Sequence, residues 1–404
     1  MTTPMSCSMR TTVVPNSRLI STMKRLISFF SAAFIPAHDA PSFRESWRRL
    51  EARSVEANIF YGSTFALAAC RHLKRAEQPV FLFVSDTTRP AHDQLVGVLP
   101  LVAERSGGMT PAFGTWRNPY TSLGVPLIDP DSLDEVLQTM LQALANRHAD
   151  DALLAFRSID RHGMVAGALR RIARDTGQAL AEANAASRAL LLPTGLAPTE
   201  VTRKRRKEIA RQRRRLSETG TLRFVLHRDC ASVRPALERF LHLEVAGWKG
   251  ARGTALVQDP GLAAFTRSAL WMLAETGDAR IAELFLDDRP IASAIVLVAD
   301  RTAFLWKIAY DEDFAKHGPG VRLVETLSQA LLADGIVAVD SCARPGHAMI
   351  ESIWPGRREL ADVIISVAPG PDDAVRSMIA SEARRMQWRE RAKGIYYSLR
   401  GWSH

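Results

Sequence analysis

Two stretches of the chain show the same order of apolar and polar segments. In residues 79–156, two apolar runs joined by the turn-rich residues 87–93 predict a hairpin, and an extended stretch, a helix and a short strand follow. In residues 280–340, two apolar runs joined by residues 287–289 predict a second hairpin, again followed by a strand, a helix and a strand. The order hairpin, strand, helix, strand therefore occurs twice, which suggests two copies of one supersecondary unit.

Apolar periodicity predicts further elements outside these two units. They are two helices in residues 43–73, a helix at 162–177, a strand at 187–192, a basic helix at 199–220 and one or two helices at 372–401. With 404 residues, 47% of them hydrophobic, the chain is long enough for two or three lobes. The domains predicted on this basis are a tail at 1–40, lobes at 41–195 and 221–368, a basic helix at 196–220 and C-terminal helices at 369–404.

The first 40 residues differ from the rest of the chain. Three basic residues in 18–25 precede an apolar run at 26–35. This outline is that of a weak signal peptide or an interfacial helix, and the alternative is a mobile tail. No apolar run approaches the roughly 20 residues that span a bilayer. We expect a cytoplasmic protein, with peripheral membrane contact as a further option.

The cysteines give no metal or disulfide signal. Cys7, Cys70, Cys230 and Cys342 are scattered, and no pair has CxxC spacing. Neither a disulfide framework nor a structural zinc site is supported, so the sequence predicts no metal and fits a reducing compartment.

The positive charge of the chain is concentrated in one segment. Residues 203–215 hold nine Lys or Arg and one Glu, which accounts for eight of the ten net positive charges. Val201, Ile209 and Leu216 form a narrow apolar stripe on the same predicted helix. The segment reads as a solvated basic face or as a contact for an anionic partner. No aromatic residues are interleaved with the charges, so sequence-specific nucleic-acid recognition is not supported.

The most informative turn is Gly318-Pro319-Gly320, between a predicted strand at 303–310 and a helix. Glycine lets a ligand approach the backbone, and the N–H groups and dipole of a helix N-terminus favour an anion such as a pyrophosphate. Lys316 and Arg322 lie nearby. The competing interpretation is a tight turn that only starts a helix, because short glycine motifs are weak signals. The equivalent helix of the first unit begins with Asp129-Pro130-Asp131, so any phosphate site belongs to the second.

Several segments together resemble the CelD/BcsL-like acyltransferases of the GNAT superfamily, which are related to FemAB-like tandem folds. The resemblance covers about residues 43–365, and its most specific parts are 248–255 and 307–320. The segments that carry it are 204–216, 240–244, 247–250, 253–256, 307–312, 318–320 and 340–347. The resemblance implies an α/β (α+β) fold of two tandem GNAT-like lobes, each a mixed, mostly antiparallel sheet flanked by helices. It also implies an acyl-CoA donor, acetyl-CoA above all, and a link to cellulose or exopolysaccharide production.

The family's pyrophosphate motif, Q/R-x-x-G-x-G/A, falls on residues 315–320. Gly318 and Gly320 match, whereas Ala315 stands where the family has Gln or Arg. Lys316 or Arg322 are the candidates to supply that charge. The preceding strand is expected to open and pair its backbone with the pantetheine arm. The predicted donor-binding residues are Lys307, Ile308, Ala309, Lys316, Gly318, Gly320, Val321 and Arg322.

Acyl transfer needs a base for the acceptor, donors for the oxyanion and an acid for the leaving thiolate. His347, in a loop after a strand, and Glu244 are the candidate bases, and Tyr310 is the candidate acid. The alternatives are that Tyr310 only packs, that Glu244 pairs with Lys249 or an arginine, and that His347 is simply exposed. Cys342 could act as a nucleophile with His347. The predicted substrate-binding residues are Trp248, Lys249, Asp340 and Cys342.

Three functions follow from these patterns. The first is an acyl-CoA-dependent transferase that modifies a hydroxyl or amine of a sugar-like acceptor. The second is a FemAB-like aminoacyl transferase that uses charged tRNA, with the basic helix as the RNA contact. The third is a non-catalytic scaffold of a polysaccharide synthase, in which Ala315 reflects a lost donor site.

Overall fold

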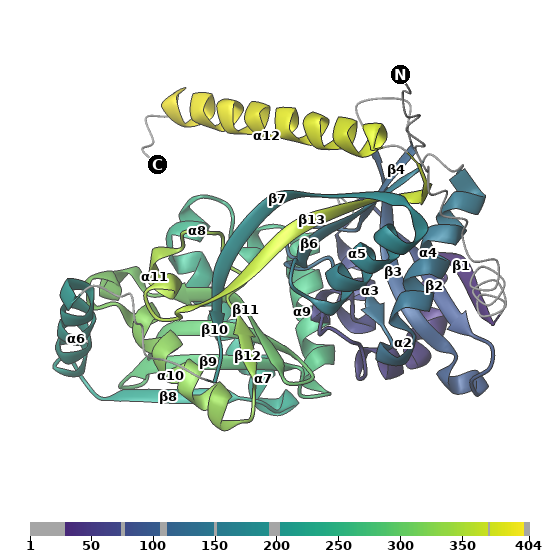
Figure 1. Cartoon of the computed structure of the whole chain (residues 1–404). Helices are drawn as coiled ribbons and strands as arrows, with labels where there is room; N and C mark the ends of the chain where they lie inside the picture. Colours follow the sequence, from purple (N-terminus) through teal and green to yellow (C-terminus); the bar gives the residue numbers. More distant parts are fainter. Residues whose placement is uncertain are drawn as a thin grey trace, which may run out of the picture.

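The structure is a computed structural model that describes residues 29–73, 77–105, 111–148, 152–193, 203–370 and 372–399. Its strands form one 13-stranded sheet with the order β1-β2-β3-β4-β6-β13-β7-β12-β11-β10-β9-β8, and β5 pairs with β3. The order reads as two halves that meet at the long strands β13 and β7. Figure 1 shows these two strands arching from one half of the molecule to the other.

The first half of the sheet is antiparallel except at one pair. β1 to β4 run antiparallel in sequence order, and β4 and β6 are parallel. Its elements are β1 (Phe30–Pro36), α2 (Arg44–Glu51), α3 (Ser63–His72), β2 (Val80–Asp86), β3 (Leu95–Arg105), β4 (Pro111–Thr115), β5 (Leu127–Ile128), α4 (Leu133–His148), β6 (Leu153–Asp160) and α5 (Met164–Thr176).

The second half repeats this arrangement. β8 to β11 run antiparallel in sequence order, and β11 and β12 are parallel. Its elements are β8 (Leu222–His227), α7 (Cys230–Ala246), α8 (Trp248–Ala251), α9 (Pro260–Ala274), β9 (Ala279–Leu286), β10 (Arg289–Ala299), β11 (Thr302–Tyr310), α10 (Pro319–Ala333), β12 (Ala338–Asp340) and α11 (Ala348–Glu351). The two copies of hairpin, strand, helix and strand are therefore β2 to β6 and β9 to β12.

The strands β7 (Gln178–Leu191) and β13 (Gly356–Pro369) join the halves. They pair antiparallel with each other over most of their length. The end of β7 also pairs with β12 of the second half, and β13 pairs with β6 of the first half. A predicted boundary near residue 195 therefore divides the chain but not the sheet, because each lobe contributes its last strand to the junction.

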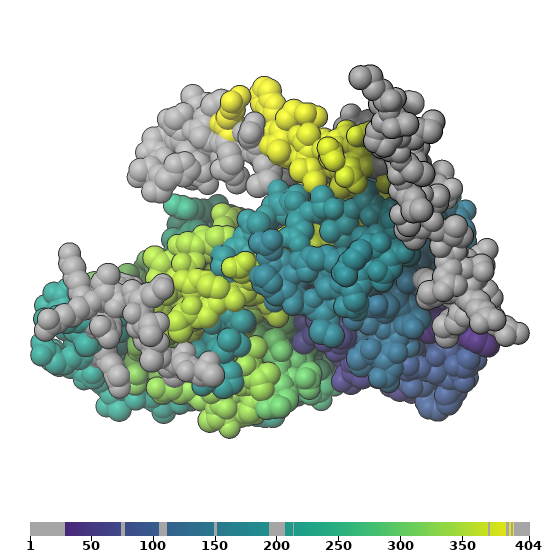
Figure 2. Space-filling model, in the orientation of Figure 1, coloured from purple at the N-terminus to yellow at the C-terminus, as the bar shows by residue number. Residues whose placement is uncertain are grey.

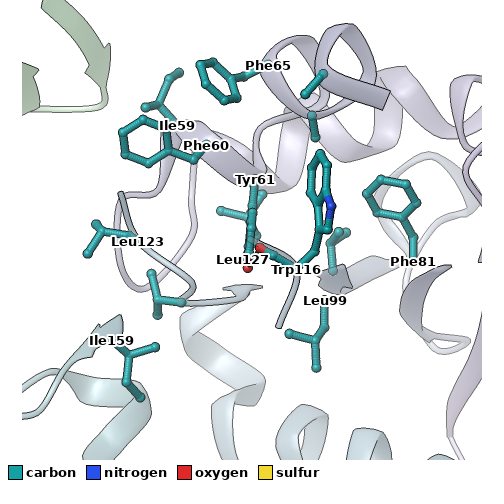
Figure 3. Close-up of a cluster of buried hydrophobic side chains, with 14 of the residues drawn as sticks. Ile59, Phe60, Tyr61, Phe65, Phe81, Leu99, Trp116, Leu123, Leu127 and Ile159 are labelled. Carbon is teal, nitrogen blue, oxygen red and sulfur yellow. Dashed lines mark hydrogen bonds between the residues drawn. The ribbon is translucent and has the colours of Figure 1, made fainter. Parts of the chain in front are cut away.

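A continuous apolar core crosses the junction. Phe60 and Phe65 of the first half lie with their ring centroids 5.3 Å and 5.9 Å from those of Phe304 and Trp306, respectively, in edge-to-face contacts. Tyr61 lies in the same cluster, shown in Figure 3, and donates a hydrogen bond of 2.6 Å to the Trp116 carbonyl. Such aromatic contacts bury large surfaces, so they fix how the two halves sit against each other.

Helix α12 (Asp373–Leu399) is a single helix that begins on the first half. Val375 and Met378 are buried in a small cluster with residues of β4, β6 and β13. Just beyond them, Glu382 forms an ion pair of 2.5 Å with Arg157, which also pairs with Glu104 and Asp362. In Figure 2 the yellow residues of α12 lie against the teal surface of the first half. Trp388 further along is 70% exposed.

Most predicted elements are confirmed, and two predictions are wrong in part. Residues 30–36, assigned to the N-terminal tail, form the edge strand β1, which pairs with β2 along its whole length. The strand predicted at 187–192 begins at Gln178, because pairing with β13 extends it. Residues 1–28, which carry the rest of the signal-like segment, and Val201 lie outside the described residues.

Candidate active site

The two parallel strands of the second half separate after residue 304. β11 pairs with β12 at three positions, the last of them Phe304 with Asp340, where β12 ends. β11 continues to Tyr310 with β10 on one edge only. Among the described residues, no strand pairs with the other edge of 305–310. A ligand chain could therefore hydrogen-bond to this edge, as the sequence analysis expected.

Helix α10 begins beside this open segment. Gly318 is left-handed, with φ +61° and ψ +47°, and no side chain caps the helix. A larger residue at Gly318 would be strained by the left-handed φ, and its Cβ would lie 2.8 Å from the Gln212 side-chain oxygen of α6 (Arg203–Ser217), which would have to shift. A Cβ on Gly320 would lie 3.6 Å from Tyr310 and 3.7 Å from Ile308. The uncapped helix N-terminus thus adjoins the open part of β11.

A pocket lies where α7 and α8 approach the end of β11. Its lining mixes apolar, acidic and basic side chains. The lining residues are Leu243, Glu244, Gly247, Trp248, Lys249, Ile308, Ala309, Tyr310 and Glu312. Six of them, Glu244, Trp248, Lys249, Ile308, Ala309 and Tyr310, are site residues that the sequence predicted.

Glu244 and Lys249 form a buried ion pair in this pocket. Glu244 is 3% exposed, and its Oε1 lies 2.7 Å from Lys249 Nζ. Its Oε2 accepts a hydrogen bond of 2.8 Å from the Leu256 backbone N–H. Lys249 also donates to the Ile308 carbonyl at 3.3 Å. Glu244 is thus held by two donors in this structure, which is the pairing that the sequence analysis named as the alternative to a catalytic base.

Asp340 and Cys342 lie at the apex of the strand opening. Asp340 is fully buried, and its Oδ2 accepts from Arg188 of β7 and Arg358 of β13, both at 2.7 Å. Burial raises the pKa of Asp340, but the two guanidinium groups outweigh burial and hold that pKa below its usual value. Asp340 thus ties β12 to the two crossing strands, which is a structural role.

The Cys342 thiol is poorly suited to be a nucleophile. Burial, with a smaller contribution from Asp340, raises the pKa of Cys342 to about 12. The thiolate is the reactive form of cysteine, so at neutral pH the reactive fraction is very small. Cys342 has φ +50° and its N–H donates to Asp340 Oδ1 at 2.8 Å. Cys342 thus forms a tight turn after β12.

Tyr310 and His347 occupy different surroundings. Tyr310 is half-buried in the pocket, and burial followed by the charge of Glu312 raises the pKa of its phenol. The phenol therefore stays protonated at neutral pH, as an acid requires. His347 is exposed, precedes the short helix α11 and is not among the pocket residues. Its role as a base stays a prediction.

The remaining predicted donor residues surround the start of α10. Gly320 and Val321 are buried, Arg322 is half-buried and Lys316 is exposed. Trp248 is 47% exposed, with the Arg252 guanidinium 5.1 Å from its ring centroid. Within the described residues, no group of three or more His, Cys, Asp or Glu side chains could hold a metal ion, and no described helix is long and apolar enough to cross a membrane.

Three residues that the sequence analysis did not name also contribute to this region. Tyr120, from the loop after β4, accepts a hydrogen bond of 3.0 Å from Trp306 through its carbonyl. Arg188 holds Asp340, and Gln212 lies at Gly318. Each comes from a different element far away in the sequence, so local patterns give no signal for it.

Residues 203–347 match the family model for the acetyltransferase (GNAT) domain. This range includes β11, α10 and the pocket. A search of curated protein sequences finds no match to the chain. The matched domain and the repeated arrangement of the sheet give a mixed α/β fold of two tandem GNAT-like lobes.

Solved structures resemble the fold over most of the chain. One is the C-terminal domain of a putative lysylphosphatidylglycerol synthetase from Agrobacterium fabrum, with 12% identity, a TM-score of 0.51, and coverage of 84% of this chain and 96% of that chain. Another is L-PGS from Bacillus licheniformis, with 13% identity, a TM-score of 0.50, and coverage of 85% and 96%. A third is FemX, with 10% identity, a TM-score of 0.51, and coverage of 86% and 99%. At these identities the similarity concerns the fold alone.

Proposed function

We propose that the chain is an acyl-CoA-dependent acyltransferase that transfers an acyl group, acetyl by preference, to a hydroxyl or amine of a sugar or polysaccharide precursor. The observation that carries the proposal is the uncapped, glycine-started N-terminus of α10 beside the unpaired edge of β11. The GNAT match over the same residues supports it. The link to cellulose or exopolysaccharide production rests on the CelD/BcsL-like resemblance.

The residues present fit a pyrophosphate in three respects and depart in one. Gly318 gives close backbone approach, the first turn of α10 offers N–H groups, and Lys316 and Arg322 bring positive charge. The departure is Ala315, whose methyl group cannot donate a hydrogen bond or a charge to a phosphate. Apart from the Ile308 carbonyl, which accepts from Lys249, the open edge of β11 over Lys307, Ile308 and Ala309 offers backbone groups to an extended amide-containing arm.

The pocket between α7, α8 and β11 is the proposed place of the acceptor. Trp248 gives an exposed aromatic face of the kind on which a sugar ring can pack, and Lys249 and Glu244 give polar groups for its hydroxyls. Tyr310 can donate a proton to the leaving thiolate. Such a site needs no covalent intermediate, which agrees with the raised pKa of Cys342.

Calorimetric titration with acetyl-CoA and desulfo-CoA tests the donor. We expect micromolar binding to wild type and a loss of about 100-fold, or about 2.8 kcal/mol, in Gly320→Glu, which places a carboxylate where a pyrophosphate would lie. Gly320→Ala is the matched control, because its Cβ meets neighbours only at 3.4–3.7 Å. No heat with folded wild type would reject the acyl-CoA donor.

A second candidate is a FemAB-like aminoacyl-tRNA-dependent transferase. The basic helix α6 favours it, because Gln212 brings α6 against the start of α10, where an RNA backbone could follow a donor end. The names of the similar structures, lysylphosphatidylglycerol synthetase and FemX, are a further reason to test this candidate. This candidate predicts tRNA binding that weakens steeply with salt, and no binding of desulfo-CoA.

Three further roles are proposed, and each predicts a different experimental result. A non-catalytic scaffold would bind neither donor, and its function would survive His347→Ala. An anionic partner at residues 203–215 would be lost when these charges are removed. Peripheral membrane contact through α12, where Trp388 is exposed, would appear as binding of the full chain to anionic vesicles.

A further inference from the structure

A β-bulge precedes Lys307 in the part of β11 that has no partner strand on its other edge. In the pairing of β10 with β11, Ile295 lies opposite Lys307 and Val296 opposite Leu305, so Trp306 is the extra residue. Trp306 packs in the core shared by both lobes. The Lys307 Nζ lies 5.4 Å from the centre of the Trp306 ring. The bulge thus directs two consecutive side chains to one face, which is how bulges re-aim residues at sites.

The Lys307 amine lies between the two lobes without an ion-pair partner. Its Nζ is 5.2 Å from the ring centre of Tyr120, which belongs to the first lobe. No ion pair or hydrogen bond of the Lys307 side chain occurs among the described residues. Glu244 is the carboxylate that favours the positive charge of Lys307, but it is already paired with Lys249 at 2.7 Å. Within the described residues, the Lys307 amine therefore contacts aromatic rings and has no hydrogen-bond acceptor.

The charged and titratable groups around Lys307 come from four other segments of the chain. Lys249 opposes its positive charge, whereas Glu244 and Cys342 favour it. Tyr120 contributes its ring face. Burial is the largest effect, and with Lys249 it lowers the pKa of Lys307 to about 8. About half of the Lys307 amines are then neutral at pH 8, whereas an ordinary lysine is less than about 1% neutral.

We propose that Lys307 is the catalytic base of the transfer reaction, an inference that rests on the proposed function. Its neutral amine takes the proton from the acceptor hydroxyl or amine as that atom attacks the thioester carbonyl carbon. A C–O or C–N bond forms and the C–S bond breaks. The thiolate leaves with a proton from Tyr310, whose phenol is restored by solvent, and Lys307 returns its proton to solvent.

This assignment differs from the role that the sequence gave to Lys307. As a donor-binding residue, Lys307 would offer its backbone groups to the donor, and its side chain would tolerate replacement by Arg. As a base it must lose its proton, which Arg cannot do in a protein. The first lobe contributes to this residue, because the Tyr120 ring lies against the Lys307 amine.

The first test reads the ionisation of Lys307 directly. The full chain is treated with limiting acetic anhydride between pH 6 and 10.5, and peptide mass spectrometry gives the labelling rate at each lysine. We expect a midpoint near pH 8 for Lys307, against about 10.4 for an ordinary lysine side chain. A Lys307 midpoint above 10 would overturn the proposal, whatever the acyl donor is.

The second test compares Lys307→Met and Lys307→Arg, with Arg223→Met, at an exposed position of the edge strand β8, as the control. Release of free thiol from acetyl-CoA, with water as the acceptor, is followed against pH. We expect the wild-type rate to rise to a plateau above pH 8, and both Lys307 variants to fall at least 100-fold. Desulfo-CoA should bind all four proteins within about threefold.

The outcomes separate this inference from the proposed function. If wild type does not bind desulfo-CoA, the acyl-CoA function fails, and the labelling midpoint still decides the state of Lys307. If Lys307→Met alone loses desulfo-CoA binding, Lys307 is a donor-binding residue. An active Lys307→Arg, or a wild-type rate no faster than buffer with desulfo-CoA bound, also overturns the role as a base.

Discussion

The two lobes begin the corresponding helix in opposite ways. In the second lobe, α10 starts at Gly318 with no side-chain cap. In the first lobe, the helix is entered at Asp129, which is 1% exposed and accepts a hydrogen bond from the Asp131 N–H. Asp129 also pairs with Arg53 at 2.6 Å and Arg89 at 2.8 Å. The first lobe thus supplies its own anion where the second leaves room for one from a ligand.

The space where the two parallel strands separate also differs between the lobes. β4 pairs with β6 at residues 112–114, as β11 does with β12. In the first lobe, however, the loop after β4 returns into the opening. Gly124 lies so close that an added Cβ would be 2.1 Å from the Arg157 carbonyl and 2.6 Å from Thr115 Oγ1. The same loop carries Tyr120 to Lys307 of the second lobe. The opening of the first lobe is therefore filled by this loop, and the same loop contributes to the opening of the second lobe.

The largest effect is expected from reopening the first lobe. Gly124→Val would force a branched side chain against the backbone of β6 and displace the loop. We expect a loss of more than about 3 kcal/mol in the free energy of unfolding, or failure to fold. Gly167→Ala is the control, because an added Cβ at Gly167 meets only Arg171 at 3.7 Å. Gly335→Ala would not serve, because Gly335 has a positive φ. A Gly124→Val protein as stable as wild type would contradict the filled opening.

The second-largest effect, a loss of stability, is expected from removing the Asp129 carboxylate of the first lobe. Asp129→Ala leaves Arg53 and Arg89 without their buried carboxylate, and we expect a loss of about 2–3 kcal/mol in urea unfolding. Burial raises the pKa of Asp129, but hydrogen bonds from Arg89 and Arg53 outweigh it and lower that pKa overall.

A lowered pKa in the folded state means that Asp129 stabilises the fold above the unfolded pKa of about 3.9, and that this contribution is lost as pH falls further. The stability difference between wild type and Asp129→Ala should therefore be constant from pH 5 to 7 and shrink below pH 4. Asp131→Ala, an exposed site beside it, is the control. Equal stability of Asp129→Ala and wild type at pH 7 would show that the arginines find other partners.

The sequence predicts those parts of this comparison that are local. The two hairpins, the basic helix and the contrast between Asp129 and Gly318 follow from periodicity, turn residues and helix-start chemistry. β1 was missed because basic residues before an apolar run also look signal-like, and only pairing with β2 reveals a strand. The alanine-rich start of β7 becomes a strand through β13. Lys307 and Tyr120 meet only because the lobes pack together, which local patterns do not encode.

A smaller effect is expected from giving the second lobe an acid. Gln212→Glu would bring a carboxylate to Gly318, where the Gln212 oxygen already lies close to the turn. This mimics Asp129 without its arginines. We expect desulfo-CoA binding to weaken about tenfold, or about 1.4 kcal/mol, while Gln212→Ala stays within about threefold of wild type. Unchanged binding in Gln212→Glu would place the donor away from this helix start.

The smallest effect is expected from the exposed charges of α6. Lys207 and Arg211 are exposed, and Arg211 already pairs with Glu208 at 2.6 Å. Exposed charges interact weakly and are screened within about 8 Å at physiological salt. For an acyl-CoA donor, Lys207→Gln with Arg211→Gln should lower the affinity less than about threefold at low salt and not measurably at high salt. For a tRNA donor, whose many phosphates would lie along α6, the same variant should lower RNA affinity more than tenfold and flatten its salt dependence. The charges of α6 thus discriminate between the two donors even though they contribute least to the first.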